Sequence, residues 1–265
     1  MTAIGFLFGA VIAGKLATEG KYMPIAALCA GVLAVFLVVT LLTVKEEPLV
    51  VVPPALRVGE FLRSFVLPWN EYRDFYFVLF TRGLVMMGIS SVFQFFQYFL
   101  RDVIKVANPI DETGLLIGII IAAGIPTSYL AGRLSDRYGR KPLVYLSGGL
   151  MAVASLIFII NGFRPSLAFT HWIGALFGVG FGAYQAVDWA LAIDVLPKGE
   201  SAARDMGIWH IALVLPQILA PAVTGITLAL FKDRSLLLGY TIVFAMTAVW
   251  FILGTVLVRY IRGAR

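Results

Sequence analysis

The sequence has little charge for its length and only one cysteine. Charged residues make up 14% of its 265 positions and hydrophobic residues 60%, whereas about a quarter of an ordinary soluble domain is charged. With a mean hydropathy of +0.91, the chain has too little polar surface to cover a water-soluble globule. Cys29 alone excludes an internal disulfide and a paired thiolate metal site. The scarcity of charge therefore excludes a compact soluble domain, and the 13% of aromatic residues excludes a disordered chain.

What the sequence does contain is a series of apolar runs that are long enough to cross a bilayer. A helix needs about 20 apolar residues to span the hydrocarbon core. The runs of this length are 23–44, 75–99, 114–132, 142–160, 166–193, 206–231 and 236–258. A further run at 1–14 reaches only about 21 Å as a helix and is interpreted as a partial span. The predicted fold class is an all-α polytopic membrane protein whose surroundings are the lipid bilayer.

Lys and Arg are distributed unevenly about these spans. Thirteen of the 21 fall on one side and seven on the other, with Arg82 inside a span. Because cytoplasmic loops carry the excess of basic residues, this distribution places the C-terminus in the cytoplasm. The basic residues lie between apolar runs, so the net charge of +6 is interpreted as a feature of membrane topology and no nucleic-acid partner is expected.

A ten-residue basic motif, GRLSDRYGRK, runs from Gly132 to Lys141 between the second and third of the six spans after residue 74. Its glycines, at 132 and 139, permit close helix approach and a tight reversal of the chain. Asp136 is its one acidic residue. It could cap a neighbouring helix or pair with a nearby arginine, forming a latch that breaks when the helices separate, or it could stay solvated in a loop that only sets topology. The candidate arginine partners are Arg137, Arg140 and Arg204.

This motif resembles the loop signature of the major facilitator superfamily, G-x-L-x-D-R-x-G-R-K, at every fixed position, and the resemblance extends over the chain. In that family each six-helix half carries the signature between its second and third helices. The resemblance implies that 75–265 is the six-helix C-terminal half, 45–74 the central cytoplasmic loop and 1–44 a remnant of the N-terminal half, with a partial helix at 1–14 and a span at 23–44. It also implies a gating role for the motif residues Gly132, Asp136, Arg137, Gly139, Arg140 and Lys141. Because such transporters bind substrate between their halves, a missing N-terminal half or a full-length relative is an expected partner.

Polar side chains inside the spans are the candidate substrate-path residues, because polar groups in a membrane usually face a cavity or a partner. Gln94 and Gln97 lie on one face of the first C-terminal span with Ser90 and Arg101, and Tyr98 lies beside them. In the family this span lines the central cavity. These side chains are predicted to form a hydrogen-bonding wall for a polar solute, although amides can also hold helices together. The remaining candidates for the path are Gln185, Asp188, Trp189, His210 and Gln217.

Asp188 is the candidate proton-linked acid of this set. Arg82 lies at a comparable depth in its own span, so the two are a candidate ion pair. That pair could serve proton coupling or simply close one end of the bundle. His210 could relay protons, but a lone histidine more often satisfies a neighbour.

The function predicted is secondary active transport of a small polar solute, coupled to protons. The segments from Tyr184 to Pro197 and from Arg204 to Trp209 resemble sugar-porter-like members and favour a sugar-like substrate. The alternative is a truncated, non-transporting fragment that acts only with, or on, a full-length partner. Enzyme motifs such as His-Glu-x-x-His and Gly-x-Ser-x-Gly do not occur, so no enzyme, cofactor or metal site is expected.

Overall fold

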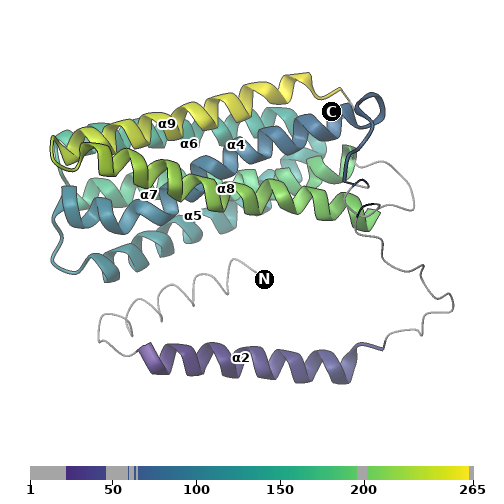
Figure 1. The fold of residues 1–265 in the computed structure, drawn as a ribbon, viewed down its shortest axis with the longest axis horizontal. Coiled ribbons are helices and arrows are strands. Elements are labelled where there is room, and N and C mark those ends of the chain that lie inside the picture. The colour runs from purple at the N-terminus through teal and green to yellow at the C-terminus, as the bar shows by residue number, and fades with distance from the viewer. Residues whose placement is uncertain (1–21, 46–58, 60–62, 64, 196–201, 263–265) are drawn as a thin grey trace.

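The computed structural model describes residues 22–45, 59, 63, 65–195 and 202–262, and six of its long helices form one bundle (Figure 1). In chain order these are α4 (Trp69–Phe99), α5 (Pro109–Tyr138), α6 (Arg140–Phe163), α7 (Leu167–Val195), α8 (Ala202–Phe231) and α9 (Leu236–Val256). A π-helical turn, η1 (Leu100–Ile104), extends α4, and a 3₁₀ turn, η2 (Leu257–Tyr260), extends α9. The expected partial helix at 1–14 and most of the expected central loop lie outside the described residues.

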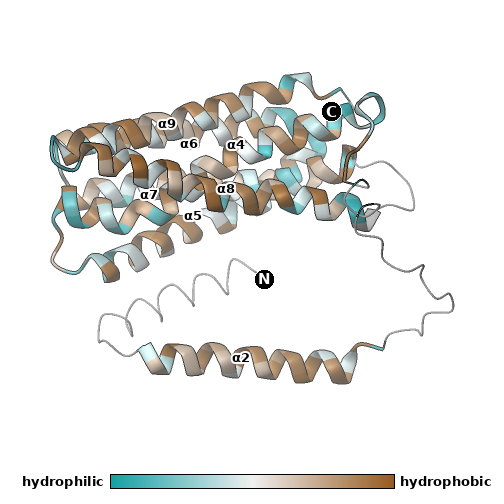
Figure 2. Ribbon diagram, in the orientation of Figure 1, coloured by the Kyte–Doolittle hydropathy of each residue, from teal (hydrophilic) through white to brown (hydrophobic). Residues whose placement is uncertain are grey.

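Before the bundle comes α2 (Tyr22–Thr43), which stands apart from it (Figure 1). None of its residues is buried. Together with the six bundle helices it makes seven helices in the described part of the chain that are long and apolar enough to cross a membrane. Figure 2 shows hydrophobic residues along the lengths of these helices and hydrophilic ones gathered at the two ends of the bundle. The predicted all-α polytopic fold is confirmed.

The helices extend beyond the apolar runs from which they were predicted. α5 continues to Tyr138 and α4 begins at Trp69, although the runs suggested boundaries at 132 and 75. Polar residues such as Glu71 and Arg137 stay helical because a helix that leaves the hydrocarbon core still satisfies its own backbone hydrogen bonds. Pro68 precedes α4 with extended backbone angles, as the residue before a helix often does.

The basic motif is consequently not a loop. Residues 132–138 are the last turns of α5, residues 140 and 141 begin α6, and only Gly139 separates the two helices. Gly139 has a φ of 94°, which a glycine adopts without a steric penalty. At Gly132, by contrast, an added Cβ would meet no atom within 4 Å. The expected tight reversal is therefore made by Gly139, and Gly132 is not at a close helix contact.

The six helices pack as two groups of three. α4 packs along its length against α8 and α9, whereas α5 and α6 both pack against α7. α6 and α9 also pack closely and so join the groups, while α4 and α7 meet over only a short stretch. The core between α4, α6 and α9 is aromatic: Phe99, Phe158 and Phe244 are buried, and their ring centroids are 5.1–6.0 Å apart.

Small residues on α7 bring it close to α5. Gly174, Gly178 and Gly182 lie one turn apart on the face of α7 that meets α5. A Cβ added to Gly182 would collide with the backbone of Gly124 on α5. Ser128 on α5 donates a hydrogen bond of 2.8 Å to the carbonyl of Gly182. Close backbone approach of this kind is a usual way for membrane helices to associate.

For the description of sites, the two ends of the bundle are named from this topology. The motif end holds Gly139, the first residues of α4 and α8, and the last residues of α7 and α9. The far end holds η1 and the first residues of α5, α7 and α9.

Candidate functional site

A buried ion pair lies where α4 meets α7. The Nη1 of Arg82 contacts the Oδ2 of Asp188, and each side chain is only 3% exposed. The hydroxyl of Tyr184, one turn before Asp188 on α7, donates a 2.9 Å hydrogen bond to the other carboxylate oxygen, Oδ1. Isolated charges are costly inside a membrane, and pairing is the common way in which a protein accommodates them. The sequence-predicted candidates Arg82 and Asp188 are therefore brought together.

A tryptophan on α8 covers this pair, and a second tryptophan, on α7, packs against the first. The guanidinium of Arg82 lies over the ring of Trp209, with Cζ 3.5 Å from the ring centroid. Trp209 is buried and its ring centroid is 5.0 Å from that of Trp189, which is 42% exposed. Cations are attracted to the face of an indole ring. The ion pair, Tyr184 and Trp209 together form what we call the buried charge cluster, which joins α4, α7 and α8.

The glutamines of α4 lie at a different level. Gln94 and Gln97 follow Arg82 by 12 and 15 residues, which corresponds to about 18 Å or more along the helix toward the far end. Both are exposed on the bundle surface, as is Tyr98. The structure thus separates these candidate path residues from Asp188. A polar strip on α4 is left uncovered by the other bundle helices.

The other candidates lie on α7 and α8. Gln185 is half-buried, one turn from Trp189, while His210 and Gln217 are exposed on α8. His210 lies beside Trp189, with ring centroids 6.4 Å apart, and its Nδ1 donates to the carbonyl of Met206 within the same helix at 3.2 Å. His210, Trp189 and the buried charge cluster therefore share one region of the bundle.

A second charged network is built on the motif. Arg140 Nη1 donates 2.6 Å hydrogen bonds to Asp136 Oδ1 and to the hydroxyl of Ser135, and its Nε lies 3.3 Å from Asp194 Oδ2 at the end of α7. Of the three partners open to Asp136, the structure selects Arg140. Arg140 thereby ties the reversal between α5 and α6 to α7.

The remaining basic residues of this region have other contacts. Arg137 lies over the ring of Tyr138, and the Nζ of Lys141 donates to the carbonyl of Ile261 beyond α9. Arg204 pairs with Asp205 at 2.9 Å and donates to the hydroxyl of Tyr72 on α4 at 3.0 Å. These contacts tie α6 to the C-terminal segment and α8 to α4 at the motif end.

The partners that were not among the predicted residues include Tyr184, Trp209 and Asp194. Tyr184 could have been found, because it precedes Asp188 by four residues and shares its helix face. Trp209 and Asp194 depend on how different helices pack, which spacing along one helix does not reveal. Within the described residues, no three His, Cys, Asp or Glu side chains are grouped so that they could hold a metal ion.

Comparison with known proteins identifies the architecture. A profile of the Major Facilitator Superfamily matches residues 1–221, which include the motif and the buried charge cluster. The chain belongs to the major facilitator superfamily. The resemblance that the motif indicated is thus confirmed, and the protein is an integral, multi-pass member of a superfamily of transporters.

Three relatives from the superfamily illustrate the similarity. The tetracycline resistance protein, class E, of Escherichia coli is 27% identical over 146 residues, which are 52% of this chain and 33% of that protein. The multidrug resistance protein MdtL of Shewanella sp. (strain ANA-3) is 26% identical over 166 residues, 61% of this chain and 40% of the relative. The uncharacterized MFS-type transporter YddS of Bacillus subtilis (strain 168) is 31% identical over 120 residues, which are 45% of this chain and 27% of that protein. The chain thus spans less than half the length of these relatives.

Proposed function

We propose that this chain, whose bundle corresponds to the C-terminal half of a superfamily transporter, is a secondary transporter that moves a small polar solute across the membrane together with protons. The observation that carries the proposal is the buried charge cluster at the meeting point of α4 and α7. Ionisable side chains inside a membrane are rare, and they mark substrate paths or proton relays more often than simple packing sites.

Asp188 is the proton-accepting group in this proposal. In its charged form it holds Arg82, and the two together tie α4 to α7. When a proton neutralises Asp188, this electrostatic tie is lost, and α4 and α7 are then held only by their short stretch of packing. Proton binding at one carboxylate would in this way favour a rearrangement of the helices that line the path.

The solute is proposed to contact two separate parts of the path: the uncovered polar strip on α4 and, nearer the motif end, exposed groups on α7 and α8 beside the buried charge cluster. Gln94 and Gln97 provide amide donors and acceptors, and Trp189 provides an exposed aromatic face beside the buried charge cluster. The names of the two resistance proteins refer to tetracycline and to multiple drugs. None of the three relatives has a name that refers to a sugar. The sugar-like substrate remains one hypothesis and a drug-like substrate another.

The motif end is proposed to face the cytoplasm. It carries the larger share of the Lys and Arg residues, and cytoplasmic segments are enriched in both. Asp136, Arg140 and Asp194 would then act as a cytoplasmic latch, since Arg140 joins α5 and α6 to α7 at that end.

Transport can be tested with the purified chain in proteoliposomes, under a pH gradient imposed in either direction. Uptake of radiolabelled sucrose and of tetracycline is measured for the wild type, for Asp188→Asn and for the control Asp233→Asn, an exposed carboxylate in the far-end turn. We expect gradient-driven uptake of one of these probes by the wild type and the control, and its loss in Asp188→Asn. Gradient-driven uptake that persists in Asp188→Asn would refute the coupling role.

The alternative, a non-transporting fragment that acts with a partner, predicts a different outcome of the same assay. The purified chain would then show no gradient-driven uptake of either probe, and cross-linking in native membranes would capture a second, larger transporter chain. That pair of results would replace autonomous transport with a partner-dependent role.

A further inference from the structure

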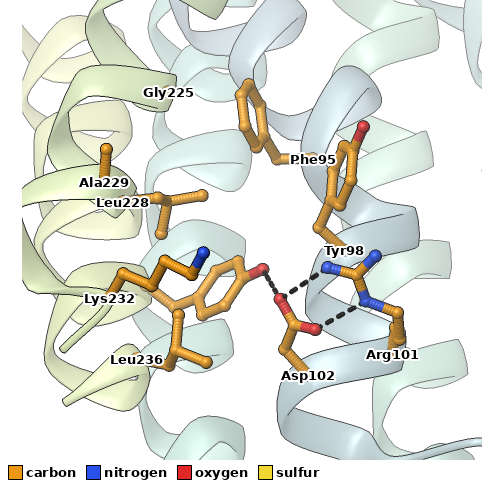
Figure 3. Close-up of a pocket in the computed structure, with 10 residues that line it drawn as sticks. Phe95, Tyr98, Arg101, Asp102, Gly225, Leu228, Ala229, Lys232 and Leu236 are labelled. Carbon is orange, nitrogen blue, oxygen red and sulfur yellow. Dashed lines mark hydrogen bonds and ion pairs between the residues drawn. The ribbon is translucent and has the colours of Figure 1, made fainter.

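A pocket of about 470 Å³ lies at the far end of the bundle, away from the buried charge cluster and the motif (Figure 3). Its walls come from α4 and η1 on one side and from α8 and the start of α9 on the other. Phe95, Leu228 and Leu236 provide apolar walls, and the charged lining residues are Arg101, Asp102 and Lys232.

The acidic group in this pocket is already neutralised by its neighbours. Both carboxylate oxygens of Asp102 are engaged: Oδ1 accepts from Arg101 Nε at 2.7 Å, while Oδ2 accepts from Arg101 Nη2 at 3.3 Å and from the hydroxyl of Tyr240 at 2.8 Å. The guanidinium of Arg101 also lies over the ring of Tyr98, 5.1 Å from its centroid. Arg101 is thus held in position by Asp102, and the charge of Asp102 is balanced by Arg101.

Lys232 is different, because no hydrogen bond or ion pair involves its ammonium among the residues that the structure describes. Figure 3 shows its side chain extending from the turn after α8 toward the space between α8 and α4. With Asp102 balanced by Arg101, Lys232 gives the pocket one uncompensated positive charge. An ammonium carries three donors and no acceptor, so this charge suits an anion.

The position of the pocket in the membrane indicates which anion. Lys232 follows the last residue of α8, and Leu236 begins α9, so the charged groups lie at the level where apolar helices end. Tyrosines at such a boundary, here Tyr98 and Tyr240, are typical of the headgroup region. Below them the pocket continues along α8 to Gly225, where an added Cβ would meet no atom within 4 Å. An anionic phospholipid fits both features, because its headgroup can pair with the charge of Lys232 and its acyl chain can occupy the apolar part of the pocket.

We propose that this pocket binds an anionic phospholipid from the leaflet at the far end. Lys232, with the outward edge of Arg101, contacts the phosphate, and the acyl chain lies between Phe95 and Leu228. The proposal depends on the membrane location and on the pocket itself, which shares Tyr98 with the candidate substrate path but includes neither Gln94 and Gln97 nor the buried charge cluster.

Native mass spectrometry of the purified chain can test it, with dioleoyl phosphatidylglycerol and dioleoyl phosphatidylcholine added in turn. These lipids share their acyl chains and differ in net charge. We expect the wild type to bind phosphatidylglycerol about fivefold more tightly than phosphatidylcholine, because this is the gain in affinity that the attraction between one basic residue and an anionic headgroup provides. Lys232→Gln should remove this preference and Lys232→Arg should keep it. The matched control, Arg234→Gln, removes an exposed cation from the same turn that does not line the pocket.

Two further measurements distinguish a lipid site from other sources of anion binding. Gly225→Leu fills the apolar part of the pocket without altering its charge, and we expect it to weaken binding of both lipids. Glycerophosphoglycerol, the headgroup without acyl chains, should compete poorly. The proposal is overturned if Arg234→Gln acts like Lys232→Gln, because binding would then follow surface charge alone, or if glycerophosphoglycerol binds as tightly as the lipid.

Discussion

The buried charge cluster allows a quantitative prediction about stability. Arg82 and Asp188 are each 3% exposed, so removing either one leaves the other charge in a site with almost no water. The loss of one partner from a buried pair typically costs about 3–5 kcal/mol. We expect Arg82→Met to lower the free energy of unfolding by about this amount, because it strands the carboxylate and removes the cation from the face of Trp209. Asp188→Asn should cost about 3 kcal/mol, at the lower end, because the amide still accepts the hydrogen bond from Tyr184.

The double variant makes this reasoning testable. Arg82→Met combined with Asp188→Asn has no stranded charge and keeps the acceptor for Tyr184. Its loss of stability should therefore fall below that of either single variant, and the coupling energy in the double-mutant cycle should exceed about 3 kcal/mol.

Unfolding by sodium dodecyl sulfate in mixed micelles, followed by far-ultraviolet circular dichroism, measures these free energies. Tryptophan emission is unsuitable because Trp209 contacts Arg82 itself, and a thiol-reactive dye would report the exposed Cys29 on α2 and not the bundle. A coupling energy under about 0.5 kcal/mol would mean that the two residues act independently, and the ion pair would then make no contribution to the stability of the bundle.

Two other predictions use matched pairs of positions. Gly182→Ala should destabilise the bundle by about 2 kcal/mol, because the added methyl group would collide with the backbone of Gly124. The matched variant Gly132→Ala places its methyl group in open space and should leave stability unchanged or raise it. The same detergent titration measures both variants. Arg140→Met should cost about 1 kcal/mol, since it releases two partly exposed carboxylates, and Arg137→Met should cost less. Equal losses for the two arginine variants would contradict a linking role for Arg140.

The sequence predicted the fold well because membrane helices are specified mainly by their own composition. Each of the seven apolar runs corresponds to a helix, because the polar backbone groups of a segment in lipid must find their hydrogen-bond partners within that segment. The ends were less predictable. The run ending at 132 and the run beginning at 142 both extend into the motif, because helicity continues through charged residues where hydropathy falls, and only Gly139 interrupts it.

The candidate site was predictable in part. The two buried charges could be expected to meet, because each lies well inside its span and an unpaired charge there is costly. The shared helix face of Gln94 and Gln97 could be predicted, but their exposure and their separation from Asp188 depend on how the helices pack. The pocket at the far end was not predicted at all. Asp102 and Lys232 belong to different helices and lie at the ends of apolar runs, where charges are ordinary, so neither stands out in the sequence.

The positions of the polar contacts suggest why the buried charge cluster matters for the whole bundle. Ser91 and Thr224 share a 3.0 Å hydrogen bond between α4 and α8, which belong to one group of three helices. Ser128 and Gly182 are bonded between α5 and α7, which belong to the other. The contact between Arg82 and Asp188 instead crosses from one group to the other, as the close packing of α6 on α9 also does. Because charge attraction depends on protonation and apolar packing does not, this crossing point can respond to a proton while the contacts within each group of helices stay intact.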